Sequence, residues 1–588
     1  MPPRSSIILG ISFGHGDSSA ALVVDGHLVA AAEEERFTRT KHYALFPTEA
    51  AKYCLQHAGL KPSDVTILAI PKQQWKHAGR RFQAYWKHPQ LFSTAGKRRE
   101  TAPKLSNWLK EMGLARARMF SCEHHLAHLA TARCLKPEEP MALLSLDGMG
   151  DFTSATMAVA DEQKTQVLDR IFFPHSLGYF YTGMTQYLGF PHYGDEFKVM
   201  GLSSYGTPRY LPVLRELIRE TDGFGFELNL EAFPILRNPI QFRIEKGQPY
   251  IDPFFSTGFL TQCLGIGPRN PKRQPIEQVH RDLAKSIQCR FEEVADHLLH
   301  ALYAKTGMKS LGLSGGCAHN SVWVGKIPKR TPFQNIYVAP ACHDAGLAAG
   351  AAILAARSIV SVEGGHWGLL GPTIEEMGQP ADPKKKKHFS DEASLVRWAA
   401  ERLSQGEIIG LAHGRLEFGP RALGSRSILA DPRYPGMRDR LNERVKHRET
   451  FRPFAASVLA EYQNDWFFNS FHSPHMEAVF EVKPAVRDQI PAVVHADNTC
   501  RIQSVEKETQ SFYWNLIEAF RQLTGIPMLI NTSFNDSEPI VASEKDAMAC
   551  FLKSDLDHLI VDQTVYSKAE LTEASTTKDL DASQSVTA

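Results

Sequence analysis

Residues 7–32 read IILGISFGHGDSSAALVVDGHLVAAA, and the fold class follows from this pattern. An apolar run is followed by a loop of Gly, His, Asp and Ser and by a second apolar run, after which Asp25-Gly26 favours a two-residue hairpin turn. The same order returns at residues 142–160, where ALLSLD leads into GMGDFTSA and TMAVA. The order of strand, polar loop and returning strand thus occurs twice. This repeat indicates duplicated halves that face each other across a cleft.

Two more glycine-rich turns follow along the chain. LGLSGGCAHN at residues 311–320 leads from an apolar run into a helix, and YVAPACHDAGLAAGAAILAA at residues 337–356 passes through a His-Asp-Ala-Gly loop into an Ala-rich helix. Strand-to-helix turns of this kind leave backbone N–H groups free to hold phosphate. Four such turns in one region indicate an α/β fold with a nucleotide-binding cleft.

The bulk properties narrow the class of protein. A chain of 588 residues is too long for one hydrophobic core, so two or more domains are expected. The 66 basic and 65 acidic residues give a net charge of +1, which provides no overall attraction to nucleic acid or to an anionic membrane. Nine cysteines without a C-x-x-C pair indicate neither a disulfide framework nor a structural zinc site. Because no signal-peptide pattern is present, a cytoplasmic location and no membrane partner are expected.

Composition also places the domain boundaries. Residues 358–390 carry several Gly and Pro with little periodicity, and α/β patterning resumes near residue 391. The sequence predicts a first domain over residues 1–360, a linker over 361–390 and a second α/β domain over 391–570. Residues 571–588, which lack aromatic side chains and are rich in Ser, Thr and Ala, are expected to form a disordered tail.

Two charged stretches allow more than one interpretation. Residues 72–104 are strongly basic with interleaved aromatic residues, which is typical of a surface for nucleic acid or an acidic ligand. An amphipathic helix with a charged outer face gives the same pattern, and the neutral balance of the whole chain favours that helix. The run EEERFTRTKH at residues 33–42 would by itself indicate a solvated helix face.

The sharpest local signal for chemistry is HHLAH at residues 124–128. On a helix, His124 and His128 project from one face and could chelate one metal ion. Asp147 and Asp344 both follow strands at the expected cleft and could complete the ligand set. Two imidazoles with carboxylates suit Fe(II), Mn(II) or Zn(II) better than Mg(II). A polar helix surface is the alternative interpretation, and the neighbouring Asp loops favour the metal site.

Candidate groups for proton transfer and anion binding lie elsewhere in the chain. His15 in the first polar loop could take a proton from an attacking hydroxyl, although a turn or capping role explains it equally well. In the second domain, a set of donors suits bidentate contacts to phosphate. Its members are Arg421, Lys446, Arg448, Arg452, Arg501, Asn531 and Ser533. If these cations converge, a polyanion such as ATP would have to neutralise them.

Taken in order, these motifs resemble the O-carbamoyltransferase family of antibiotic and nodulation-factor biosynthesis. The motifs quoted above are joined by EEERFTRTKHYALFP at residues 33–47, GPRALGSRSIL at 419–429, RVKHRETFRPFA at 444–455 and INTSFND at 530–536. The resemblance runs from about residue 7 to residue 565. It implies an enzyme, a carbamoyltransferase that acts on a hydroxyl of a small-molecule natural product.

The resemblance also implies a fold and a reaction. The N-terminal domain would be actin-like, of the ASKHA type found in tRNA threonylcarbamoyl transferases, and the C-terminal domain would be a YrdC-like α/β domain. The C-terminal domain would convert carbamoyl phosphate and ATP, the latter with Mg²⁺, into carbamoyl-adenylate and pyrophosphate. The N-terminal domain would transfer the carbamoyl group to the acceptor as AMP leaves. Fe(II) is the implied metal, with other divalent ions as alternatives.

Site residues carry over from the family motif by motif. His15 would be the general base, and Lys41 would contact the adenylate and assist catalysis. The implied metal ligands are His124, His128, Asp147 and Asp344. The residues implied to line the carbamoyl-adenylate are Lys41, Asp147, Gly148, Met149, Gly150, Asp151, Gly316 and Asn320. ATP and carbamoyl phosphate would be held by Arg421, Lys446, Arg452, Arg501, Asn531 and Ser533. Cys317 and His319 are less typical of the family, so their surroundings are expected to differ in detail.

Two other functions compete with this interpretation. A tRNA-modifying threonylcarbamoyl-type enzyme would use related chemistry, and the basic stretch 72–104 is its main support. The presence of both half-reactions in one chain favours the small-molecule enzyme, so no nucleic-acid partner is expected. A non-catalytic ATP-dependent regulator on an actin-like core would need neither the histidine-bound metal nor carbamoyl phosphate. For assembly, a homodimer is one option.

Overall fold

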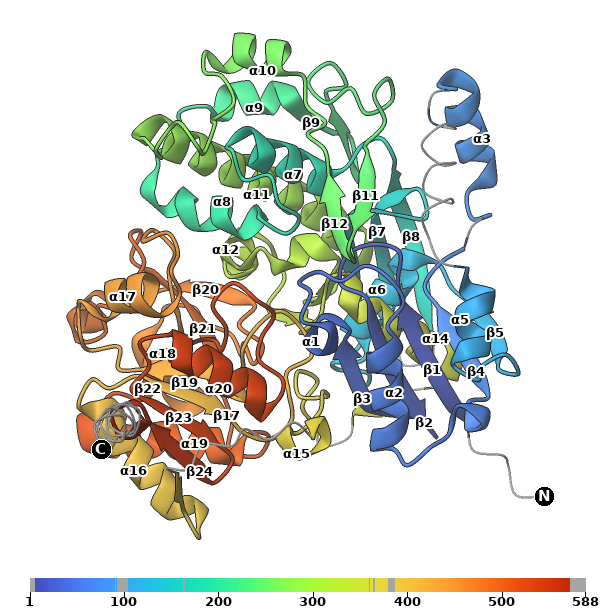
Figure 1. Ribbon diagram of the computed structural model, residues 1–588. Helices are drawn as coiled ribbons and strands as arrows, with labels where there is room; N and C mark the ends of the chain where they lie inside the picture. The colour runs from blue at the N-terminus through green and yellow to red at the C-terminus, as the bar shows by residue number, and fades with distance from the viewer. Residues whose placement is uncertain are drawn as a thin grey trace, which may run out of the picture. The chain divides into compact units, whose positions relative to one another are not determined.

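The computed structural model describes residues 6–73, 75–89, 91, 104–161, 164–358, 360–362, 365–378 and 386–571. Figure 1 shows the arrangement of its helices and strands. The chain divides into two compact units. Unit 1 comprises Met1–Trp367 with Glu477–Val479, and unit 2 comprises Gly368–Met476 and Phe480–Ala588. Apart from Leu571, the expected disordered tail lies outside the described residues.

The first sheet of unit 1 is built from the stretch that opens the sequence. Its strand order is β15-β3-β2-β1-β4-β5. β1 pairs antiparallel with β2 and parallel with β4, and Ile8, Leu9 and Ile11 of β1 are fully buried. The strands are β1 (Ile7–Ser12), β2 (Ser19–Val24), β3 (His27–Glu33), β4 (Ile67–Ile70), β5 (Arg118–Ser121) and β15 (Ser361–Val362).

The second sheet of unit 1 repeats this topology. Its order is β14-β13-β6-β7-β8, with β6 antiparallel to β7 and parallel to β13. The strands are β6 (Met141–Gly150), β7 (Thr153–Ala160), β8 (Thr165–Phe172), β13 (Ser310–Ser314) and β14 (Asn335–Val338). β1 and β6 thus hold the same central place in their sheets, which confirms the duplication predicted from the two loop motifs.

The duplication also includes one helix from each half of unit 1. α6 (His124–Arg133) follows β5, and α14 (Leu347–Ala356) follows β14. The two helices pack against each other, and α14 also packs against β1. Further helices of unit 1 are α1 (Glu35–Thr38), α2 (Thr48–His57), α3 (Ala78–Lys87), α5 (Leu105–Glu111), α7 (Leu177–Tyr187), α8 (Glu196–Leu202), α9 (Leu211–Leu217), α10 (Thr257–Leu264), α11 (Gln278–Thr306), α12 (Ser321–Val324) and α13 (Ile327–Arg330).

Smaller elements complete unit 1. Between α9 and α10 the chain forms two hairpins, β9 (Ile218–Thr221) with β10 (Gly225–Leu228) and β11 (Phe242–Glu245) with β12 (Gln248–Ile251). A single turn of 3₁₀-helix, η4 (Asp344–Gly346), precedes α14. Asp344 therefore lies directly at the entry to the helix that packs on α6.

The acidic run after β3 is buried, so the interpretation of residues 33–42 as a solvated helix face is wrong at its start. Glu33, Glu34, Glu35 and Arg36 are all buried. Arg36 pairs with Glu33 and Glu35, and Glu34 accepts the backbone N–H of Ala50 at the start of α2. Pairing within the run satisfies charges that would otherwise require water.

Part of the basic stretch 72–104 forms a helix, α3, and the charged residues Arg80 and Lys87 of this helix are exposed. Arg80 lies over the ring of Phe172 in β8, with its guanidinium carbon 4.1 Å from the ring centroid. The aromatic side chains of Phe82 and Trp86 are exposed as well. Residues 74, 90 and 92–103 of this stretch lie outside the described residues.

Unit 2 is built on a nine-stranded mixed sheet of order β16-β24-β23-β17-β18-β22-β19-β21-β20. Its strands are β16 (Lys387–His388), β17 (Ile409–Ala412), β18 (Arg426–Ala430), β19 (Ala455–Leu459), β20 (Ala478–Glu481), β21 (Thr499–Val505), β22 (Met528–Ser533), β23 (His558–Val561) and β24 (Thr564–Ser567). Its helices are α15 (Ile374–Met377), α16 (Glu392–Ser404), α17 (Met437–Arg440), α18 (Gln463–Trp466), α19 (Ser511–Thr524) and α20 (Glu544–Lys553). The fold of this unit is α/β.

The stretch 361–390 is not a separate linker. β15 at its start pairs with β3 of unit 1, and β16 near its end pairs with β24 of unit 2. Within it, residues 363–364 and 379–385 lie outside the described residues. Among the residues that the structure describes, no helix combines the length and the apolar character needed to cross a lipid bilayer.

Candidate active site

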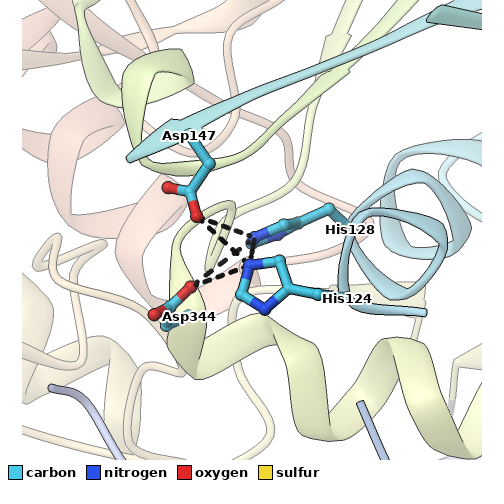
Figure 2. A group of neighbouring side chains, drawn as sticks. All are labelled: His124, His128, Asp147 and Asp344. Atoms are coloured by element: carbon cyan, nitrogen blue, oxygen red, sulfur yellow. Dashed lines mark hydrogen bonds and ion pairs between the residues drawn. The ribbon is translucent and has the colours of Figure 1, made fainter. Parts of the chain in front are cut away.

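Four side chains of unit 1 converge on one point (Figure 2). His124 and His128 lie one turn apart on α6, Asp147 comes from β6, and Asp344 begins η4. His124 Nε2 is 3.1 Å from Asp147 Oδ2 and 3.5 Å from Asp344 Oδ1. His128 Nε2 is 3.7 Å and 3.6 Å from the same two oxygens. The structure therefore brings together all four residues that the sequence named as metal ligands.

The two histidines do not belong to a polar helix surface, so that alternative interpretation is wrong. His128 is fully buried, and His124 is 6% exposed. Between them, His125 points the other way and contacts the Ser145 hydroxyl at 2.9 Å and the Thr153 carbonyl oxygen at 2.9 Å. His124 and His128 are thus left to face the two carboxylates.

The geometry of the cluster fits a divalent cation. Donors arranged around one ion at about 2.1 Å would lie roughly 3–3.4 Å from one another, close to the spacing observed here. The imidazole nitrogens His124 Nε2 and His128 Nε2 are 3.1 Å apart, a pair that needs a shared proton or an ion. Asp344 Oδ1 is buried and has no hydrogen-bond partner among the described residues. An orphaned carboxylate oxygen aimed at two imidazoles is suited to ligation.

The charges of the cluster also favour a bound cation. Burial alone would raise the pKa of Asp147, but the imidazoles of His124 and His128 outweigh it and hold that pKa well below its usual range. Burial would lower the pKa of His128, but Asp147 and Asp344 raise it to about 9. Two half-buried carboxylates thus require positive charge beside them, which either imidazole protons or a divalent cation can provide.

His15 is joined to this cluster through Asp344. Its Nδ1 lies 3.0 Å from Asp344 Oδ2 and 2.9 Å from the Gly16 carbonyl oxygen, and its Nε2 lies 3.2 Å from the Ser12 hydroxyl. The ring is therefore held by one nitrogen while the other faces a hydroxyl. A carboxylate that orients an imidazole in this way is the usual support of a general base.

Lys41 lies in a strained turn that is tied to the loop of His15. Arg39 and His42, on either side of it, have φ of 57° and 55°, in the left-handed region. The Asp17 carboxylate lies 2.7 Å from Nδ1 of His42. Backbone hydrogen bonds from Gly14 to Ala44 and from Ser18 to Tyr43 connect the two loops. The structure therefore places Lys41 on the same side of unit 1 as His15.

The loop at the end of β6 wraps around the histidines. A Cβ on Gly150 would lie 2.0 Å from the ring of His124, so only glycine fits there. Asp151 Oδ2 accepts the backbone N–H of His124 at 3.0 Å. The other predicted members of this loop, Gly148 and Met149, lie between Asp147 and Gly150 in the same strand.

Gly316 and Asn320 occupy the turn after β13, and their contacts differ. The Gly316 N–H donates to Asp147 Oδ1 at 3.0 Å, so it fixes a candidate ligand. Asn320 Oδ1 accepts the Trp323 N–H at 3.1 Å and caps α12, while its amide also bonds with Gln288. In this structure Asn320 serves the local fold.

The sequence did not indicate a chain of polar groups behind the cluster. His319 lies 3.3 Å from the Cys342 sulfur through Nδ1 and 3.0 Å from His343 through Nε2. His343 Nε2 in turn lies 3.8 Å from carboxylate oxygens of Asp17 and Glu33. The only signal in the sequence is the position of His343 directly before Asp344.

In unit 2, guanidinium groups gather around Arg501 of β21. Burial lowers the pKa of Arg501 well below its usual range, and the charges of Arg421, Arg448 and Arg452 lower it further. Burial likewise lowers the pKa of Arg448 to about 9, and Arg452 adds to that effect. Arg501 Nε is buried without a hydrogen-bond partner among the described residues. Such a cluster is suited to a polyanionic ligand.

The remaining predicted residues of unit 2 lie nearby in the sheet. Arg501 and Asn531 are each in register with Ala455 of β19, on its two sides. Asn531 is fully buried and its Oδ1 lacks a hydrogen-bond partner among the described residues.

Lys446 and Ser533 form a separate contact. The Lys446 ammonium donates to the backbone oxygens of Ser533 at 2.8 Å and Asn535 at 2.5 Å, and also to Asn535 Oδ1 at 2.7 Å. The Ser533 hydroxyl donates to Asn535 Oδ1 at 2.8 Å. In this structure Lys446 therefore fixes the turn after β22.

Two family models match the chain in the order of its two units. The model described as the carbamoyltransferase N-terminus covers residues 7–353, and the one described as the carbamoyltransferase C-terminus covers residues 400–568. The chain belongs to the carbamoyltransferase family. A carbamoyltransferase is an enzyme of the transferase class, so the regulator without catalytic activity is set aside.

Relatives support the same assignment. The carbamoyltransferase is 35% identical to the nodulation protein NolNO of Sinorhizobium fredii over 96% of this chain and 81% of that protein. It is 37% identical to the nodulation protein NolO of Bradyrhizobium diazoefficiens over 74% of this chain and 77% of that protein. It is also 35% identical to the uncharacterized protein sll1178 of Synechocystis over 95% of this chain and 96% of that protein.

Proposed function

We propose that this carbamoyltransferase is an ATP-dependent O-carbamoyltransferase with two half-reactions. Unit 2, as a YrdC-like domain, makes carbamoyl-adenylate from carbamoyl phosphate and ATP. Unit 1, as an actin-like domain, transfers the carbamoyl group from the adenylate to a hydroxyl of a small-molecule natural product. The His/Asp cluster with its attached His15 supports the second step, and the arginine cluster supports the first.

The first half-reaction needs a site for polyanions. Carbamoyl phosphate is hydrolysed to carbamate and phosphate, and a carbamate oxygen then attacks the α-phosphorus of ATP. The bond between that phosphorus and the bridging oxygen breaks, and pyrophosphate leaves with the electron pair. Arg421, Arg452 and Arg501 would bind the phosphate groups, because guanidiniums in a desolvated cluster are stabilised by an anion.

The second half-reaction needs a base for a weak nucleophile. The acceptor oxygen attacks the carbamoyl carbon, the bond from that carbon to the AMP oxygen breaks, and AMP leaves. His15 would take the hydroxyl proton on Nε2, because Asp344 and the Gly16 carbonyl fix its Nδ1 side. Lys41 would contact the anionic adenylate from the neighbouring turn.

A divalent ion, Fe(II) in the proposal, would be held by His124, His128, Asp147 and Asp344. When bound, it would act as a Lewis acid toward the phosphate of the adenylate. The Gly316 N–H and the imidazoles would keep the Asp147 carboxylate oriented for that purpose. Mg²⁺ would accompany ATP in unit 2.

One observation carries the proposal: His15 Nδ1 lies 3.0 Å from Asp344 Oδ2, which links a candidate base to the candidate metal site. The test is pyrophosphate release from purified protein with ATP and Mg²⁺, measured with and without carbamoyl phosphate. We expect release only when carbamoyl phosphate is present. Release that is independent of carbamoyl phosphate, or none from folded and iron-loaded protein, would refute the activation step.

A further inference from the structure

Three aromatic side chains at the margin of unit 1 are exposed to solvent. Trp75, in the turn before α3, is 84% exposed, and Phe82 and Trp86 on α3 are 66% and 76% exposed. Phe82 and Trp86 are one helical turn apart, and their ring centroids lie 6.2 Å from each other. Each such side chain could bury about 150–250 Å². Phe82 and Trp86 together form an exposed apolar patch of the kind that marks an interaction site, and Trp75 adds a third exposed ring in the preceding turn.

Two arginines of α3 contact the domain, while the rings of Phe82 and Trp86 are exposed to solvent. Arg80 lies over the ring of Phe172, and Arg81 lies 3.8 Å from Asp151 Oδ1. A surface helix normally buries its apolar residues and exposes its charges. Here no residue of α3 is buried, and the helix lies beside β8 in Figure 1. Exposure of the aromatic rings is costly in water unless a partner covers them.

The segment is also uniformly basic. Residues 71–89 contain no Asp or Glu, and their cations are Lys72, Lys76, Arg80, Arg81 and Lys87. Lys87 is exposed at the end of α3, beside Trp86. The partner should therefore combine an apolar layer with negative charge.

We propose that α3 and the turn before it, the surface formed by Trp75, Phe82, Trp86 and Lys87, dock on an anionic lipid bilayer. Trp and Phe rings insert readily at the boundary between headgroups and acyl chains. Each Lys or Arg near an anionic surface adds about 1 kcal/mol of attraction. The docking is peripheral, and it differs from the sequence-based expectation that the protein has no membrane partner.

A bilayer fits this surface better than a nucleic acid. Nucleic-acid binding relies chiefly on Lys and Arg contacts to phosphates. Arg81 is paired with Asp151, and Lys76 lies 3.5 Å from Glu123, so part of the positive charge of the segment is already compensated. In addition to its cations, α3 presents the aromatic rings of Phe82 and Trp86 to solvent, which suit the boundary between headgroups and acyl chains of a bilayer.

The docking surface is connected to the candidate transfer site. The Gln73 N–H donates to Asp151 Oδ2 at 3.0 Å, and the same oxygen accepts the N–H of His124. The proposal does not depend on the function proposed above, because lipid binding can be measured without any carbamoyl donor or acceptor.

The test is sedimentation of the full-length protein with phosphatidylcholine vesicles, with and without phosphatidylglycerol. We expect co-sedimentation only with phosphatidylglycerol, and loss of binding toward 1 M salt, where the Debye length is about 3 Å. The variant Trp75→Ala/Trp86→Ala should bind at least about tenfold more weakly, since one buried aromatic side chain contributes about 1.5–3 kcal/mol. Lys87→Glu should weaken binding to a smaller extent.

A matched control removes exposed apolar side chains elsewhere. Leu523 and Leu552 in unit 2 are 55% and 57% exposed, and Leu523→Ala/Leu552→Ala should bind vesicles like the wild type. Circular dichroism and carbamoyl phosphate-dependent pyrophosphate release should be unchanged in both double variants. The proposal is wrong if phosphatidylglycerol vesicles fail to sediment the protein at low salt or if Trp75→Ala/Trp86→Ala binds normally. It is equally wrong if these tryptophans mediate single-stranded RNA binding or self-association without vesicle binding.

Discussion

Gly350 of α14 lies directly against Ala127 of α6: a Cβ on Gly350 would be 2.0 Å from the Ala127 carbonyl oxygen. α6 carries His124 and His128, and α14 begins just after Asp344. The distance between the two halves of the candidate metal site therefore depends on how closely these helices approach. A glycine at this contact permits the approach.

Gly350→Ala tests this relationship. The added methyl group must push the two helices apart, because backbone atoms cannot move aside as a flexible side chain can. We expect a loss of at least about 2–3 kcal/mol in the free energy of unfolding despite the higher helix propensity of Ala. Thermal or urea unfolding measures the loss. Gly258 lies in α10, and a methyl group added there would have nothing within 4 Å, so Gly258→Ala should be neutral or slightly stabilising.

Gly150→Ala should displace His124 and weaken metal binding. The new Cβ would lie 2.0 Å from the imidazole ring. At Gly148, two residues earlier, the nearest atom would be 3.4 Å away, on the ring of Tyr179, so Gly148→Ala is the matched control. A thermal shift on addition of Mn²⁺ or Zn²⁺ reports binding, since an ion at 100 times its Kd stabilises by about 2.7 kcal/mol. An unchanged shift in Gly150→Ala would contradict this geometry.

His15→Ala should abolish carbamoyl transfer and leave pyrophosphate release nearly intact. A positioned general base typically contributes about 10²–10⁴-fold to the rate. His192, an exposed histidine of unit 1, provides the control variant His192→Ala. Both half-reactions are measured on protein whose fold is verified by circular dichroism. If a folded His15→Ala protein loses both of them, His15 is not the base of the transfer step.

Arg452→Ala should block adenylate formation. Each hydrogen bond to a charged phosphate group contributes about 1.5–3 kcal/mol, so pyrophosphate release should fall about 10–100-fold. Arg521 is the control, because its guanidinium pairs with Glu518 one turn away on α19. Arg521→Ala should release pyrophosphate at the normal rate. Normal release by Arg452→Ala would remove Arg452 from the site.

Much of unit 1 could be predicted from local sequence. The repeated loop after an apolar run identified β1 and β6, and the duplicated sheets confirm it. His124, Asp147 and Asp344 were recognisable because each lies at the start of a helix or near the end of a strand, where short-range patterns are strong. These features depend on a few neighbouring residues, and such features can be inferred without knowledge of tertiary contacts.

Other features depend on contacts between distant residues. Nothing in the sequence indicates that Ala127 and Gly350 touch, and that contact sets the spacing of the cluster. The acidic run that begins at Glu33 has the pattern of a solvated helix face. The pattern does not reveal that Arg36 is buried and forms an ion pair with Glu33. The sequence suggests Lys446 as a phosphate ligand. In the structure its ammonium donates to backbone oxygens of the turn after β22.

The contacts that α3 makes with the domain could not be predicted, for a related physical reason. A hydrophobic pattern predicts which residues share a helix face, and the face that meets the domain is then assumed to be apolar. In α3, Arg80 stacks on Phe172 and Arg81 pairs with Asp151, so two cations contact the domain while Phe82 and Trp86 are exposed. Such pairing depends on partners far away in the sequence.

Exchange of labelled pyrophosphate into ATP is the decisive measurement for the proposed mechanism, because it requires reversible formation of an adenylate on the protein. We predict that label enters ATP only when carbamoyl phosphate is present, and that Arg452→Ala slows the exchange about 10–100-fold while His15→Ala does not. Exchange without carbamoyl phosphate, or no exchange by folded protein that has ATP, Mg²⁺ and carbamoyl phosphate, would contradict the adenylate mechanism.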